Sequence, residues 1–91
     1  METLLSKYKD RIPVIVKNNN QKYLIKKESQ MSEFMVVLRK KIKIDSKKAI
    51  FIFVGEGILV PMNLKMGEIY NIYHHTDMVL YVTYKMENTF G

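Results

Sequence analysis

The chain has 91 residues, of which 47% are hydrophobic and none is cysteine. This length fits one domain and excludes most multi-domain enzymes. Without cysteine there can be no disulfide framework, thiolate zinc site or cysteine nucleophile, and the composition fits a reducing compartment. The longest apolar run, Ala49–Val54, has six residues, whereas a membrane-spanning helix needs about 20. The first eight residues lack the apolar segment of a secretory signal. We therefore expect a cytoplasmic protein.

The net charge of +6 is unevenly distributed along the chain. Residues 1–48 carry 13 basic and five acidic groups, a balance of +8, whereas residues 49–91 carry two basic and four acidic groups, a balance of −2. A cationic half of this strength attracts acidic peptides, anionic lipid headgroups or nucleic acid. Charge alone does not choose among these partners, and a solvated lysine-rich face is the simplest alternative.

The first half of the chain predicts a hairpin followed by a helix. Residues 11–17 are rich in β-branched side chains and predict a first strand. Residues 22–26 predict a second short strand beyond the polar loop at residues 18–21. Next, apolar residues recur at helical spacing from Met31 to Ile42, with Phe34, Met35 and Leu38 between them. We expect Ser29 or Ser32 to cap this helix.

The second half predicts two strands and a short helix. The fully apolar run Ala49–Val54 is typical of a strand that is covered on both faces or lies centrally in a sheet. A short helix over residues 66–73 and a strand over residues 79–84 follow, and residues 2–8 suggest one or two further helical turns. The pattern indicates an α+β fold with a small mixed sheet around one main helix.

Catalytic motifs are weak or absent. His74 and His75 are adjacent, so they point in different directions and do not easily share one metal; we expect a surface pair and no metal site. Gly55-Glu56-Gly57 lacks the Lys-Ser/Thr of a phosphate loop and predicts a turn. We find no basis for an enzyme and expect no cofactor.

The C-terminal tail, KMENTFG at residues 85–91, stops on glycine. Glycine has no Cβ, so a narrow active-site channel can admit its carboxylate, although a frayed terminus is the simpler interpretation. Several strings then agree in order and spacing with one family: KYKDRIPVIV, KYLI, LRKKIKI, KKAIFIFV, MGEIY, LYVTY and ENTFG. With these strings, nearly the whole chain resembles the autophagy ubiquitin-like modifiers of the GABARAP and light-chain-three type.

This resemblance implies a single ubiquitin-like β-grasp domain over residues 1–91, with a mixed four-stranded sheet. Residues 1–9 would be a truncated N-terminal helical extension, residues 10–84 the core and residues 85–91 the conjugation tail. In the family, E1-like and E2-like enzymes join the C-terminal glycine to phosphatidylethanolamine, and a cysteine protease processes precursors and removes the lipid. Gly91 matches the conjugated residue, and Phe90 its recognised neighbour. The conjugate would lie on autophagosomes or related vesicles.

The resemblance also implies a groove for acidic aromatic-x-x-aliphatic peptides of cargo receptors and adaptors. The aromatic pocket would involve Leu4, Pro13, Ile15, Lys22, Leu24 and Val79. The aliphatic pocket would involve Tyr23, Ile25, Phe34 and Val37. The acidic flank of the peptide would meet Arg11, Lys22, Arg39 and Lys41. The chain departs from the family at Ser29, usually apolar, at Lys26, often proline, and at Lys41, commonly arginine, and by one residue inserted around Gly57.

Three alternatives remain open at this point. The first is an unconjugated adaptor that only binds peptides, and the second is a role in organelle maintenance. A nucleic-acid module has only the charge in its favour, because the chain lacks the aromatic strings of an RNA-recognition motif and any metal-binding spacing; we expect no nucleic-acid partner.

Overall fold

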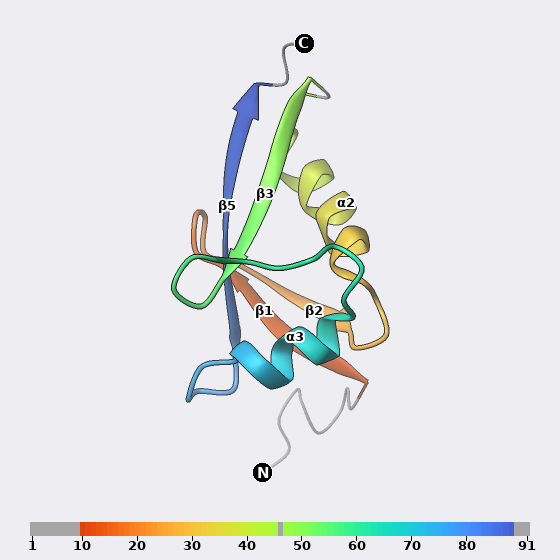
Figure 1. Cartoon of the computed structure of the whole chain (residues 1–91), viewed down its shortest axis with the longest axis vertical. Coiled ribbons are helices and arrows are strands. Elements are labelled where there is room, and N and C mark those ends of the chain that lie inside the picture. The colour runs from red at the N-terminus through yellow and green to blue at the C-terminus, as the bar shows by residue number, and fades with distance from the viewer. Residues whose placement is uncertain (1–9, 46, 89–91) are drawn as a thin grey trace.

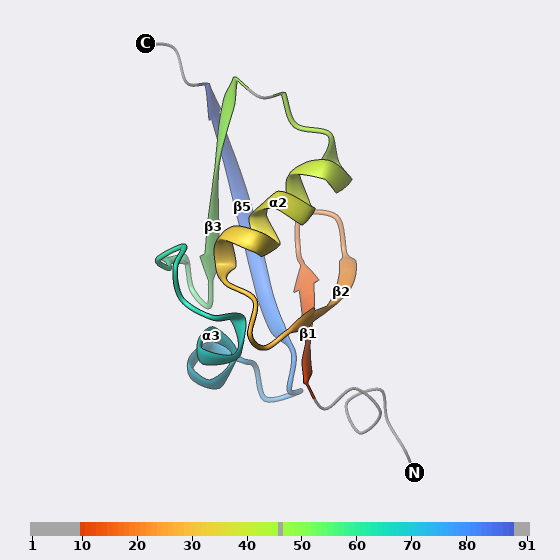
Figure 2. The same cartoon turned by 90° about the vertical axis from the view of Figure 1, so that its right-hand side faces the viewer.

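A five-stranded mixed sheet carries the molecule, and two helices pack on it (Figures 1 and 2). A computed structural model describes residues 10–45 and 47–88. The strands are β1 (Arg11–Val16), β2 (Gln21–Lys26), β3 (Lys48–Val54), β4 (Ile58–Leu59) and β5 (Leu80–Asn88), and the helices are α2 (Met31–Ile42) and α3 (Met66–Tyr73). The strand order is β2-β1-β5-β3-β4. The predicted α+β, β-grasp class is confirmed, with β4 as a fifth strand that the sequence analysis did not include.

The hairpin of β1 and β2 is as predicted. Its register pairs Arg11 with Lys26 and Val16 with Gln21, so four residues form the connection. Parallel pairing of β1 with β5 begins at Val14, directly after Pro13. Proline has no backbone N–H to donate to a ladder, and here it lies just outside the stretch that pairs on both sides.

Helix α2 begins and ends where the apolar stripe predicted, and it lies across one face of the sheet (Figure 2). The predicted cap at Ser29 or Ser32 is wrong, because the N-cap is Gln30, whose backbone N–H donates to Glu33 Oε1 at 3.3 Å. This pairing is one half of a capping box, in which the residue three positions into the helix satisfies the cap. Met31, Phe34 and Leu38 are fully buried against the sheet.

Of the two alternatives predicted for β3, the structure gives a place inside the sheet, between β5 and β4, and not cover on both faces. Ile50, Ile52 and Val54 point into the core, whereas Phe51 is 36% exposed on the opposite face. Successive side chains of a strand alternate between the two faces of a sheet. Only one face of this sheet carries the helices, so β3 is buried on that face alone.

The core is apolar throughout the described residues, with no buried polar or charged side chain. It lies between the sheet and the two helices. Its members are Ile12, Val14, Val16, Met31, Phe34, Leu38, Ile50, Ile52, Val54, Val60, Met66, Ile69, Tyr70, Leu80 and Val82. Strand β5 runs four residues beyond its predicted end at Tyr84, because Lys85 to Asn88 continue the ladder with β3.

Candidate functional site

Strand β2 forms one edge of the sheet, beside β1. Its far side pairs with no other strand among residues 10–45 and 47–88. An edge strand of this kind presents free backbone N–H and C=O groups that another extended chain can pair with. The two predicted pockets lie along this edge, one toward each face of the sheet.

The first pocket has a volume of about 510 Å³ and lies on the face of the sheet that α2 does not cover. Pro13 and Ile15 of β1 stand opposite Leu24 and Lys22 of β2 in the register, so the four side chains share that face. The lining comprises Pro13, Val14, Ile15, Lys22, Tyr23, Leu24 and Val79. It therefore gathers every residue predicted for the aromatic pocket except Leu4, which lies outside the described residues.

The second pocket has a volume of about 310 Å³ and lies between β2 and α2. Ile25, Phe34 and Val37 line it, as predicted for the aliphatic pocket. The full lining is Arg11, Leu24, Ile25, Lys26, Ser29, Glu33, Phe34 and Val37. Leu24 belongs to both pockets and forms the ridge between them.

Tyr23 borders the first pocket rather than the second. Its ring meets Phe34 of the second pocket edge-on, with centroids 5.6 Å apart and planes at 87°. The Tyr23 hydroxyl is buried and has no hydrogen-bond partner among the described residues. Burial is the main cause that raises the pKa of Tyr23, and the neighbouring Tyr84 adds to it. Tyr23 thus connects the two pockets through packing.

The four cations predicted for an acidic flank occupy different positions. Arg11 Nη1 donates to the Leu24 carbonyl at 3.3 Å, and Lys22 is exposed at the first pocket. Arg39 Nη2 donates to the Lys48 carbonyl at 2.8 Å, which directs its guanidinium toward the start of β3. Lys41 is exposed in the last turn of α2. The structure therefore brings Arg11 and Lys22 to the pockets, whereas Arg39 and Lys41 line neither.

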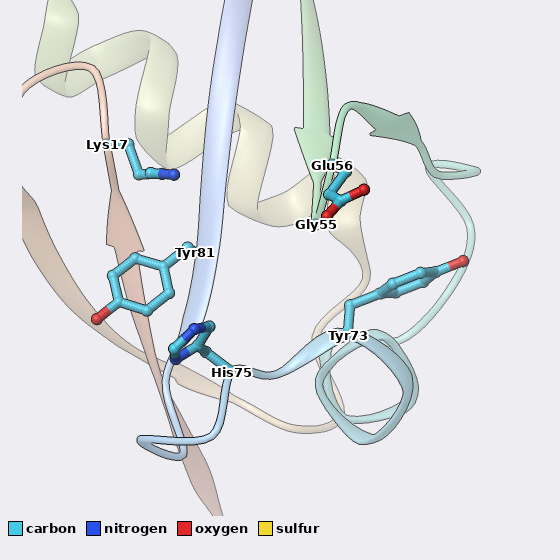
Figure 3. A pocket seen from close by; sticks show the side chains of 6 residues that line it. All are labelled: Lys17, Gly55, Glu56, Tyr73, His75 and Tyr81. Carbon is cyan, nitrogen blue, oxygen red and sulfur yellow. The ribbon is translucent and has the colours of Figure 1, made fainter.

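A third pocket, of about 380 Å³, contains none of the predicted site residues (Figure 3). It is lined by Lys17, Gly55, Glu56, Tyr73, His75 and Tyr81. Beside it, the Tyr81 hydroxyl donates to Asp77 Oδ2 at 2.5 Å, and His75 Nδ1 lies 3.6 Å from Asp77 Oδ1. The Tyr81 hydrogen bond holds the pKa of Asp77 below its ordinary value and raises that of Tyr81. No sequence periodicity joins these residues, so this cluster was missed.

The two histidines have different partners, as predicted. His74 Nδ1 lies 2.7 Å from the Tyr70 carbonyl, and its ring stacks on Tyr70, whereas His75 faces Asp77. Within the part of the chain that the structure describes, no three His, Cys, Asp or Glu side chains gather as a metal site would require. No described helix is long and apolar enough to cross a bilayer.

The arrangement of the sheet defines the class of the protein. The first and last strands, β1 and β5, run parallel at the centre, antiparallel neighbours flank them, and α2 crosses one face. This is the β-grasp of ubiquitin-like proteins.

Comparison with known proteins identifies the family within that class. The family model described as "Autophagy protein Atg8 ubiquitin like" matches residues 1–91. Autophagy-related protein 8 of Emericella nidulans is 41% identical over 99 aligned positions, which cover 99% of this chain and 83% of that protein. The Neurospora crassa protein of the same name is also 41% identical, with 81% of its length covered.

A solved structure of similar fold agrees with this result. The crystal structure of Trypanosoma brucei ATG8 superimposes with a TM-score of 0.82 at 26% identity and covers 97% of this chain and 83% of that one. The chain therefore belongs to the Atg8 family, the ubiquitin-like proteins of autophagy.

Proposed function

We propose that the protein is a membrane-conjugated modifier that acts in autophagosome formation. Gly91 would be joined as an amide to phosphatidylethanolamine by E1-like and E2-like enzymes, with Phe90 as the recognised neighbour. Membership of the Atg8 family is the observation that carries this proposal. Two acyl chains anchor a protein stably, which one chain does not achieve. Since β5 ends at Asn88, three residues separate the sheet from the attachment point, a reach of about 10 Å.

Reconstitution tests the conjugation directly. Incubation with the E1-like and E2-like enzymes, ATP and phosphatidylethanolamine vesicles should produce a faster-migrating, membrane-bound band. Gly91→Ala should abolish this band, whereas the control Leu59→Ala, at an exposed position of β4, should leave it intact. A lipidated band that survives Gly91→Ala would sink the proposal.

The groove along β2 would recruit cargo receptors and adaptors. An acidic peptide would pair with the free edge of β2 as an added strand, which is a common mode of peptide recognition. In an extended peptide, residues an odd number apart point to opposite faces. An aromatic residue and an aliphatic residue three positions later would therefore enter the first and second pockets, which lie on opposite faces of the sheet. This match between spacing and pocket placement supports the peptide class.

Charge at the groove favours an acidic peptide. Arg11 and Lys22 lie at the pockets and make no ion pair among the described residues. Such charges mainly raise the association rate and select among partners. Titration of an acidic aromatic-x-x-aliphatic peptide should give weaker binding to Lys22→Glu than to the wild type. The control is Lys85→Glu, at an exposed position of β5 that lines neither pocket. Equal affinities of wild type and Lys22→Glu would argue against the groove.

An unconjugated adaptor is the second candidate. The preformed pockets favour it independently of Gly91. It predicts peptide binding together with a chain that is never lipidated, so the reconstitution above separates the two.

A further inference from the structure

We propose that the end of the molecule formed by residues 39–45, 47 and 48 is a docking surface for anionic lipid bilayers, and we call it the basic end. It comprises the last turn of α2, the α2–β3 connection and the first residue of β3. This inference rests on the proposed function, because it concerns the membrane to which Gly91 would be joined.

The charge of the molecule is concentrated at this end. Residues 39–48 contain six basic side chains and one carboxylate, a balance of +5 in a chain whose total is +6. Residues 55–79, from the β3–β4 turn to the start of β5, contain one basic and three acidic side chains, a balance of −2. The chain measures 52 Å along its longest axis, several times the Debye length of about 8 Å at physiological salt. A charged surface near one end of the molecule therefore interacts with the charges of that end and hardly with those of the other end.

The basic end lies beside the end of β5. Lys48 is paired with Asn88 in the sheet, and Arg39 Nη2 donates to the Lys48 carbonyl at 2.8 Å. Strand β3 thus begins beside the end of β5, and the last turn of α2 faces the same end of the molecule (Figure 2). Because Gly91 follows three residues later, a lipid on Gly91 would hold the basic end, and not the acidic one, against the bilayer.

Part of this charge is not needed by the peptide groove. Phe34, Val37 and Lys41 follow one another at helical spacing, and the first two line the second pocket. Lys40 follows Val36 by four residues on a different face of α2, and Lys43 is the C-cap residue directly after the helix. Both lysines are exposed and line none of the described pockets, and Val36 is 52% exposed. Neither lysine forms an ion pair with a described residue. Exposed lysines beside an apolar side chain suit the headgroup region of a membrane.

Binding of the unconjugated chain to vesicles tests this inference. The wild type should sediment with vesicles of phosphatidylcholine containing about one part in three of phosphatidylserine and not with pure phosphatidylcholine. Each lysine near an anionic surface contributes about fivefold to the partition coefficient, so Lys40→Gln/Lys43→Gln should bind about 25-fold more weakly. The matched control is Lys17→Gln/Lys27→Gln, which removes the same two charges from exposed positions elsewhere. It should stay within a few-fold of the wild type.

Two results would overturn the proposal. The first is wild type that does not bind phosphatidylserine vesicles, and the second is an equal loss of binding in both double variants. In the first case, binding of a single-stranded oligonucleotide through Lys40 and Lys43 would make the basic end a nucleic-acid surface. Because the chain is used without conjugation, none of these results depends on whether Gly91 accepts a lipid. A failure of the conjugation reaction would overturn the proposed function, and the vesicle-binding results would still test the basic end independently.

Discussion

Replacement of Leu24 by alanine tests whether the peptide binds at the groove along β2 and not elsewhere on the surface. Leu24 is half-buried on the edge strand β2 and is the one residue that the linings of the two described pockets of the groove share. Its backbone carbonyl accepts the hydrogen bond from Arg11, and this bond survives the substitution. The change therefore removes the ridge between the pockets while the strand keeps its pairing.

The expected loss follows from the contact area. The aromatic anchor would touch the Leu24 side chain in the first pocket, and a buried methylene contributes about 0.8 kcal/mol. Since truncation to alanine removes three carbons that are only partly covered in the complex, we expect binding to weaken by about 1–2 kcal/mol. This corresponds to a dissociation constant raised about 5- to 30-fold.

Titration calorimetry with an acidic aromatic-x-x-aliphatic peptide provides the measurement. Leu59→Ala is the matched control, because Leu59 is 53% exposed on β4 at the opposite edge of the sheet. A peptide with alanine in place of its aromatic anchor completes a double-mutant cycle, in which Leu24→Ala should lose much of its effect. Equal affinities for Leu24→Ala and Leu59→Ala would refute the placement of the peptide on β2.

Three further predictions concern stability. Tyr23→Phe removes a buried hydroxyl without a described partner, so thermal unfolding should show unchanged or higher stability, by up to about 1 kcal/mol; a clear loss would reveal a partner for this hydroxyl. The hydrogen bond from Tyr81 is the main cause that lowers the pKa of Asp77 in the folded state. The Asp77 carboxylate therefore stabilises the fold above the ordinary Asp pKa, and this stabilisation is lost as the pH falls through the pKa of the folded state. The Tm difference between wild type and Asp77→Asn should shrink below about pH 4, and a constant difference would contradict this. In Gly67→Ala the new Cβ would lie 3.0 Å from Lys27 Cβ and 3.3 Å from the Lys27 carbonyl oxygen. Denaturant unfolding should therefore show a free energy of unfolding lower by about 1–2 kcal/mol, despite the higher helix propensity of alanine. A gain in stability would show that the two segments separate easily.

Helix α2 shows what the sequence could predict and where it failed. The spacing of Met31, Phe34 and Leu38 predicted the helix because the same residues that form the stripe are buried against the sheet. The cap could not be predicted from side-chain preference, since Gln30 is not a favoured N-cap residue. It is held by Glu33, and its backbone also bridges to Lys65. Tertiary pairing decided the boundary.

The strands show a similar division. Strand β4 has only two residues, Ile58 and Leu59, which are too few to show the alternation of a strand. Strand β5 extends through the mostly polar residues 85–88 because β3 is long enough to pair with them. For the candidate site, the family resemblance supplied the pocket residues. The double role of Leu24 needed the register of β1 and β2, which brings it between the two pockets.

The order of strands in the sheet differs from their order in the chain, and this has a consequence for synthesis. Strand β1 is made first, yet its second neighbour is β5, made last. A nascent chain that stops short of Leu80 leaves Val14 and Val16 without the strand that pairs beside them. Contacts so distant in sequence slow folding. We therefore expect the domain to fold late and as one unit, so that a chain able to fold has already produced the strand that leads to Gly91.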